Sequence, residues 1–147
     1  MAMDWVAGVA AVGSGLVGGV FFVFSVAIMP AFARLPERHG VAVMQAINVT
    51  IVRAPFLLVF MGTVLACVAR VVLAPTDVLG VVGAALYVLG GFGVTMALNV
   101  PLNNRLDKVD ADAPDGFWSV YASRWTLWNH VRTVACIGAA ALLTAAA

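Results

Sequence analysis

Apolar residues gather into four stretches along this chain, and each stretch is long enough to cross a bilayer. They cover residues 5–29, 55–73, 78–98 and 126–145, with only isolated polar side chains inside them. A transmembrane helix needs about 20 predominantly apolar residues. The pattern therefore predicts an all-α integral membrane protein, a bundle of four transmembrane helices. No linker or repeat divides the chain, so we expect residues 1–147 to form one transmembrane domain.

The connections between these stretches carry most of the charge. Residues 30–40 are polar and lead into residues 41–53, which also follow a helical pattern, whereas the turn at 74–77 is short and predicts an antiparallel hairpin. Lys and Arg are concentrated in the first and third connections and at the start of the last helix. By the positive-inside rule, both long connections are cytoplasmic and both termini lie outside the cell membrane.

Composition narrows the class of partner. Hydrophobic residues make up 63% of the chain and charged residues 10%, with a net charge of +1. These values indicate contact with membrane lipid and exclude the basic surface that binds nucleic acid. Cys67 and Cys136 each lie inside an apolar stretch without metal-finger spacing, so we expect two buried thiols and no metal site.

Small residues in the first helix indicate close helix packing. Ser14 and Gly18, like Gly15 and Gly19, are four residues apart, and such pairs allow two backbones to approach closely in lipid. One neighbour within a bundle does not obviously require both pairs. The sequence therefore predicts a homo-oligomer.

The start of the last helix holds the most informative polar residues. Asn129, His130 and Arg132 lie inside an apolar stretch, where ionisable groups are costly, usually turn inward and are functional candidates. A spacing of about 100° per residue places His130 on a different face from the other two. The aromatic residues before them fit either a pocket wall or an interfacial belt, and Arg132 could instead extend its head group to the interface.

The third apolar stretch ends in an amide-rich segment that is interrupted by Pro101. Such a broken helix end is tolerated at membrane depth only where it lines protein or water, although a helix C-terminus capped by asparagine is the alternative. With the predicted topology, polar residues from separate segments meet at the cytoplasmic end. They are Gln45, Asn48, Arg53, Asn99, Asn103, Asn129, His130 and Arg132. A pocket of this kind suits a planar, weakly acidic organic molecule whose anion needs stabilising.

Four motifs carry a resemblance to a known family. They read G-G-V-F-F-V-F-S, M-Q-A-I-N, N-V-P-L-N-N-R-L and W-T-L-W-N-H-V-R. Together they resemble the anthrone oxygenase family, small four-helix membrane proteins of bacteria and fungi. The resemblance implies a helical bundle and, from members of polyketide pathways, oxidation of an anthrone to an anthraquinone by molecular oxygen. In the interpretation that we favour, the substrate anion passes an electron to oxygen directly, so no prosthetic group is required, although haem stays open.

Residue chemistry then suggests a role for each candidate. We expect His130 to act as the base that removes a proton from the anthrone, because histidine is the usual general base near neutral pH. Arg132 and Asn129 complete the predicted catalytic set. Arg132 and Arg53 would stabilise the oxyanion, and Asn99, Asn103 and Asn129 would hold ring oxygens. The predicted substrate-binding residues are Gln45, Asn48, Arg53, Asn99, Asn103, Tyr121, Trp125 and Trp128.

Two other functions stay open at this stage. One is a non-catalytic scaffold or transporter component, although four helices of this length enclose little room for a transport path. The other is a haem or metal site that uses His130 together with His39, but His39 lies in the charged first connection and nothing fixes the two together.

Overall fold

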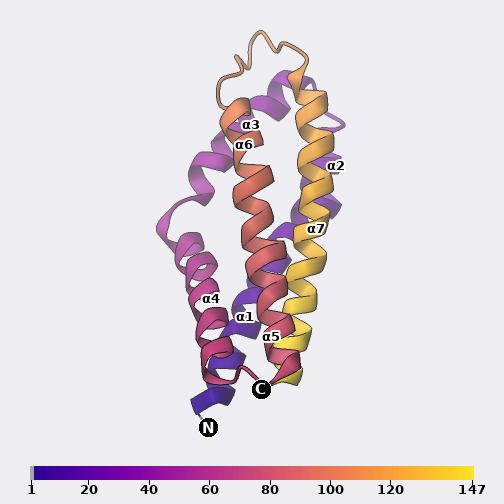
Figure 1. The fold of residues 1–147 in the computed structure, drawn as a ribbon. Coiled ribbons are helices and arrows are strands. Elements are labelled where there is room, and N and C mark those ends of the chain that lie inside the picture. The colour runs from indigo at the N-terminus through magenta and orange to yellow at the C-terminus, as the bar shows by residue number, and fades with distance from the viewer. Residues whose placement is uncertain (1) are drawn as a thin grey trace.

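The computed structural model describes the backbone of residues 2–147 and the side chains from residue 5 onward. Every regular element in this part of the chain is helical (Figure 1), as the sequence predicts. The first rod consists of α1 (Ala2–Val23), the π-helical segment η1 (Phe24–Ile28) and α2 (Met29–Phe32). The remaining elements are α3 (Glu37–Ile51), α4 (Ala54–Leu73), α5 (Val78–Ala85), π-helical η2 (Leu86–Gly93) and η3 (Thr95–Asn99), α6 (Val100–Leu106) and α7 (Phe117–Ala145).

Four long rods form the bundle, and α3 adds a shorter helix at one end. Three stretches of the described chain are long and apolar enough to cross a membrane, namely Trp5–Phe32, Ala54–Leu73 and Val78–Leu106. The fourth rod, α7, is equally long but falls outside this set because its central turns are polar. It also begins nine residues before the predicted start at 126, since the preceding aromatic residues are helical and buried.

Close packing of α1 against α4 and α7 forms the centre of the bundle. A Cβ at Gly13 would overlap the Thr63 hydroxyl, and one at Gly18 would lie 3.1 Å from Cys136 Cβ. Small residues therefore bring the backbones together, as predicted for Gly18. In contrast, a Cβ at Gly15 would make only ordinary van der Waals contact, and a Cβ at Gly19 would have no neighbour within 4 Å.

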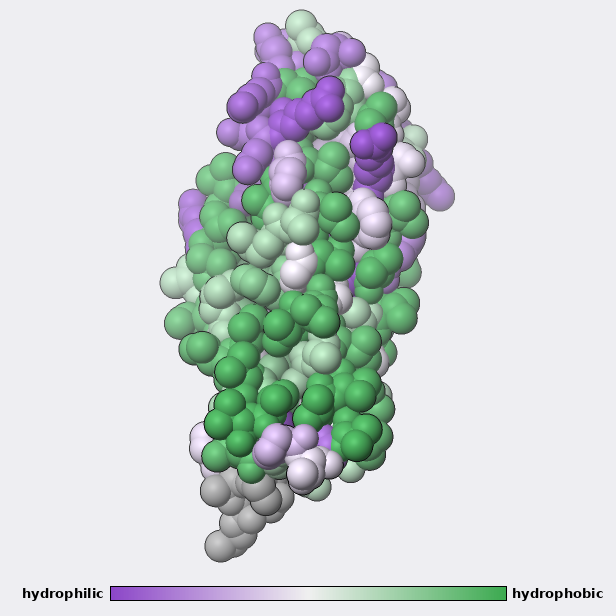
Figure 2. Space-filling view, in the orientation of Figure 1, coloured by the Kyte–Doolittle hydropathy of each residue, from purple (hydrophilic) through white to green (hydrophobic). Residues whose placement is uncertain are grey.

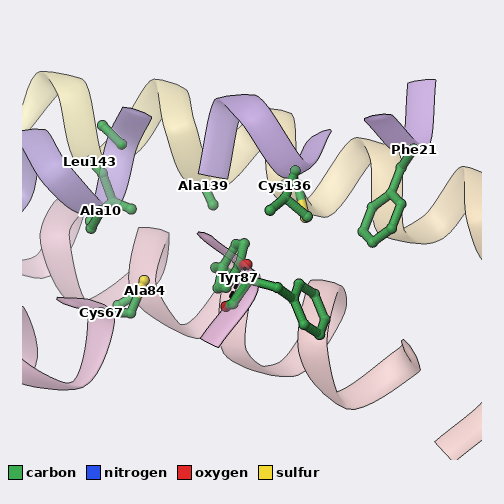
Figure 3. Close-up of a cluster of buried hydrophobic side chains, with 11 residues drawn as sticks. Ala10, Phe21, Cys67, Ala84, Tyr87, Cys136, Ala139 and Leu143 are labelled. Atoms are coloured by element: carbon green, nitrogen blue, oxygen red, sulfur yellow. Dashed lines mark hydrogen bonds between the residues drawn. The ribbon is translucent and has the colours of Figure 1, made fainter. Parts of the chain in front are cut away.

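One apolar core cluster fills the half of the bundle near the termini. Tyr87 lies there among side chains of α1, α4 and α7 (Figure 3), and its hydroxyl donates to the Phe60 carbonyl at 3.1 Å. Cys67 and Cys136 belong to the same cluster, where both are free thiols and fully buried. The prediction that they serve as small apolar residues is thus confirmed.

Proline explains two of the three π-helical segments. A proline lacks an N–H, and its ring clashes with the carbonyl four residues earlier, so the preceding turn must widen. In η1 the N–H of Met29 bonds to the carbonyl of Phe24, five residues back, and Pro30 follows directly. η3 ends in the same way immediately before Pro101. Such widened turns redirect side chains and often lie at functional sites.

Polar and apolar surfaces are separated along the long axis. Both termini lie at the lower end in Figure 1, while α3 and the 107–116 connection lie at the upper end. Hydrophilic residues gather at that upper end in Figure 2, and apolar residues cover most of the face below it. Leu58, Leu65 and Val72 of α4 are each at least 70% exposed, which fits contact with lipid.

Candidate functional site

A cavity of about 340 Å³ lies in the half of the bundle nearer α3. Its walls come from α1, η1, α3, the first turns of α4, η3, α6 and α7, and most of them are apolar. Four polar residues line it, namely Asn48, Thr95, Asn103 and Arg132. The volume falls within the ~300–1,000 Å³ of typical small-molecule pockets.

Arg132 is the one ionisable residue that lines this cavity among the described side chains. It is only 4% exposed. Its Nη1 donates to Thr95 Oγ1 at 3.2 Å and its Nη2 to Asn129 Oδ1 at 2.7 Å. The guanidinium carbon lies 4.1 Å from the ring centre of Phe21 and 4.9 Å from that of Trp125. Aromatic faces attract a cation, so both rings hold the charge in place.

This arginine is buried without a described counter-ion. Its Nε has no hydrogen-bond partner, and no described carboxylate pairs with it. A buried cation without a counter-ion is costly unless something compensates it. An anion that enters the cavity would supply the missing charge.

Asn129 fixes the orientation of Arg132. Its Nδ2 donates to the Phe21 carbonyl and to Ser25 Oγ, both at 2.7 Å. These two bonds turn the Oδ1 of the amide toward the guanidinium. Because Ser25 belongs to η1 and Thr95 to η3, both widened turns contribute a hydroxyl to this network.

Asn103 joins the cavity to an aromatic cluster. Its Oδ1 accepts from Tyr121 Oη at 2.9 Å and from Trp125 Nε1 at 3.0 Å. With the oxygen thus occupied, the amide N–H groups are left for a ligand. Trp125 also packs on Phe24, at 5.3 Å between ring centres, and so forms part of the cavity wall.

Two predicted binding residues support the site from outside the cavity. Asn99 is buried, donates from Nδ2 to the Trp125 carbonyl at 3.3 Å and leaves its Oδ1 without a partner. Gln45 donates from Nε2 to the carbonyls of Leu106 and Val109, both at 2.9 Å. Gln45 therefore holds α3 against the end of α6 and does not line the cavity.

Three predicted residues lie elsewhere. His130 is exposed on the outside of α7, and Arg53 is exposed in the turn before α4. Trp128 lines a shallow groove on another face with Arg105 and Arg124. For His130 and Trp128 the reason is helical geometry, since a residue adjacent to buried Asn129 is rotated by about 100°. Of the eight polar residues predicted to meet in one pocket, only Asn48, Asn103 and Arg132 line the cavity. Asn129, Asn99 and Gln45 lie beside it, and the prediction is wrong for His130 and Arg53.

Sequence analysis also missed part of the site. Thr95 and Ser25 are single hydroxyls in apolar stretches, and Phe21 is one aromatic residue among several. A usable signal does exist, because each hydroxyl lies five or six residues before a proline, where a widened turn is expected.

The fold and the site define a class: an all-helical membrane protein with a small-molecule cavity that contains one buried, unpaired arginine. The family described as anthrone oxygenase matches residues 44–142. The chain belongs to the anthrone oxygenase family. The matched region includes all four polar residues of the cavity wall. Comparison with curated proteins and with solved structures gives no match.

Proposed function

We propose that this protein is a membrane-embedded oxygenase that uses molecular oxygen to oxidise a planar aromatic, polyketide-like molecule such as an anthrone. The observation that carries the proposal is Arg132, a buried cation with no described carboxylate partner on the wall of an aromatic-lined cavity. Family membership supports the reaction type.

The reaction converts a ring methylene and O2 into a ring carbonyl and water. Loss of one proton from the methylene gives an anion whose charge is shared with the ring oxygen. That anion transfers one electron to O2, the two radicals combine at the former methylene carbon, and protonation gives a hydroperoxide. Elimination of water, which removes the second methylene hydrogen, leaves the carbonyl. Every oxidising equivalent comes from O2.

Arg132 would act at the first step. Its fixed positive charge stabilises the ring oxyanion, and a preorganised donor of this kind is worth most where water is excluded. The N–H groups of Asn103 would bind a second ring oxygen, and Phe21, Phe24 and Trp125 would contact the ring faces. Since no described side chain of the cavity wall other than Arg132 is ionisable, a water molecule inside the cavity would accept the proton.

Oxygen uptake by proteoliposomes with emodin anthrone tests this proposal. Wild-type protein should accelerate uptake above that of empty vesicles, and Arg132→Gln should lose about 10²–10³-fold of that acceleration. Arg124→Gln is the matched control, because it removes the same charge from an exposed position of the same helix outside the cavity. Absence of acceleration by wild type, or equal loss in both variants, would contradict the proposal.

Self-association stays a prediction, and one feature supports it. Gly15 and Gly19 lie at the surface, and a Cβ at Gly19 would meet no atom within 4 Å. A second copy could therefore approach this side of α1 closely. Replacing both glycines by leucine should lower the mass of the detergent-solubilised particle, and a wild-type protein that is already monomeric would remove the idea.

A further inference from the structure

The cavity has an apolar rim that also belongs to the outer surface of the bundle. Leu57 and Met61 of α4 are 38% and 37% exposed, and Met96 of η3 is 49% exposed. All three also line the cavity, as does Val52, which is 56% exposed in the turn between α3 and α4. A side chain that is both cavity wall and outer surface marks a place where the cavity is not closed.

This rim lies within the apolar part of the surface. Leu57 and Met61 follow the exposed Arg53 by four and eight residues, about 6 and 12 Å along α4. The hydrocarbon core of a bilayer is about 30 Å thick, with arginine concentrated near its boundary. Leu58, 72% exposed, continues the same apolar surface beside the rim. The rim therefore faces acyl chains.

Access from the aqueous end is covered by α3. Met44 is 1% exposed and forms the wall on that side. The two hydrogen bonds from Gln45 hold α3 on the carbonyl of Leu106, which ends α6, and on that of Val109 just beyond it. α3 thus covers the polar end except beside the α3–α4 turn, where exposed Val52 continues the partly open, apolar side of the cavity.

We propose that the ligand enters sideways from the bilayer, through a portal formed by Leu57, Met61 and Met96, and that Arg132 binds its acidic oxygen inside. The substrate is then a membrane-dissolved planar aromatic molecule with an acidic oxygen and otherwise apolar edges. This inference rests on the proposed function for the class of substrate. The portal itself rests on the rim residues alone.

Binding of emodin, a hydroxyanthraquinone that is not an anthrone, tests the portal without the oxidation step. Emodin is added to proteoliposomes, and quenching of tryptophan fluorescence is followed in a stopped-flow instrument, since Trp125 lies on the cavity wall. At fixed total emodin, added lipid dilutes the probe within the bilayer. Entry from lipid predicts that the association rate follows the mole fraction of emodin in the bilayer.

Variants of the rim give the second readout. Leu57→Phe with Met96→Phe narrows the portal and should slow association by about tenfold or more, within the one to three decades over which association rates vary among variants. Met96→Ala widens it and should speed association. Leu58→Phe is the matched control, because it adds the same bulk to lipid-facing surface outside the cavity, and it should leave the rate unchanged.

The results separate the portal from the oxygenase. An association rate that follows the aqueous emodin concentration would overturn the portal, as would rim variants that behave like Leu58→Phe or a wild type that binds no emodin. If emodin binding depends on the portal residues but emodin anthrone causes no oxygen uptake, the portal is supported and the proposed oxygenase activity is contradicted. If the double phenylalanine variant fails to fold, Met96→Ala still tests the portal, because only a portal at Met96 predicts faster association of emodin in that variant.

Discussion

Replacing Arg132 by methionine should abolish activity without unfolding the bundle. Wild type gains two hydrogen bonds from a charged donor, each worth about 1.5–3 kcal/mol, and two aromatic contacts worth about 0.5–2 kcal/mol each. Against these stands the desolvation of an unpaired ion, which costs several kcal/mol. The two contributions are of similar size, so the net effect of Arg132 on stability is small.

Methionine fills similar space without the charge. Its main cost is that Asn129 Oδ1 loses its partner, which is worth about 1–3 kcal/mol, while relief of desolvation offsets that loss. Thr95 Oγ1 still donates to the Gly91 carbonyl at 2.7 Å. We therefore expect the thermal midpoint of Arg132→Met in detergent to stay at or above the wild-type value.

Catalysis should respond very differently. Loss of the cation that stabilises the anion raises the barrier by about 2.7–4 kcal/mol, a loss of 10²–10³ in rate. Arg132→Lys retains a charge without the planar contacts and should recover part of that rate. Oxygen uptake with emodin anthrone and a melting curve on the same preparation measure both quantities. An Arg132→Met protein that melts well below wild type, or that retains full oxygen uptake, would refute this account of Arg132.

Three further outcomes follow from the fold. Gly13→Leu should lower the thermal midpoint strongly, because even a Cβ at this position would overlap Thr63 and push α1 away from α4. A midpoint equal to that of wild type would show that these two helices pack differently. His130→Ala should keep wild-type oxygen uptake because the His130 side chain is exposed outside the cavity. A large loss of oxygen uptake would instead support His130 as the general base. Single cysteines at 107–115 should resist an impermeant thiol reagent in intact cells while one at Thr76 reacts, and the reverse pattern would invert the predicted topology.

The all-helical membrane fold could be predicted because lipid leaves a spanning chain few alternatives. Without water, each backbone group must bond within its own segment, so a run of about 20 apolar residues predicts a helix with little further information. The start of α7 was harder to predict. Ser119, Ser123 and Arg124 interrupt the apolar pattern before residue 126. Trp118 and Tyr121 are nevertheless buried against other aromatic residues, so tertiary packing extends the helix beyond the apolar stretch.

The site was predicted only in part, because a face of a helix can be assigned from sequence but its direction cannot. The period of α7 places Asn129 and Arg132 together and His130 apart, and the structure keeps this grouping. Which face turns inward depends on the neighbouring helices. Arg132 turns inward because Phe21 and Thr95 meet it there, and neither residue is distinctive in the sequence.

The two proline-linked π-helical segments explain how a membrane bundle accommodates this site. A regular helix in lipid uses its backbone groups internally and offers little to a polar partner. In η1 and η3 the widened turns place Ser25 and Thr95 toward α7, where Ser25 binds Asn129 and Thr95 binds Arg132. Each segment lies on a different rod, so the polar network also joins the first and third rods to α7. The prolines that interrupt these helices therefore help to hold the arginine in place at the cavity wall, where no described carboxylate compensates its charge.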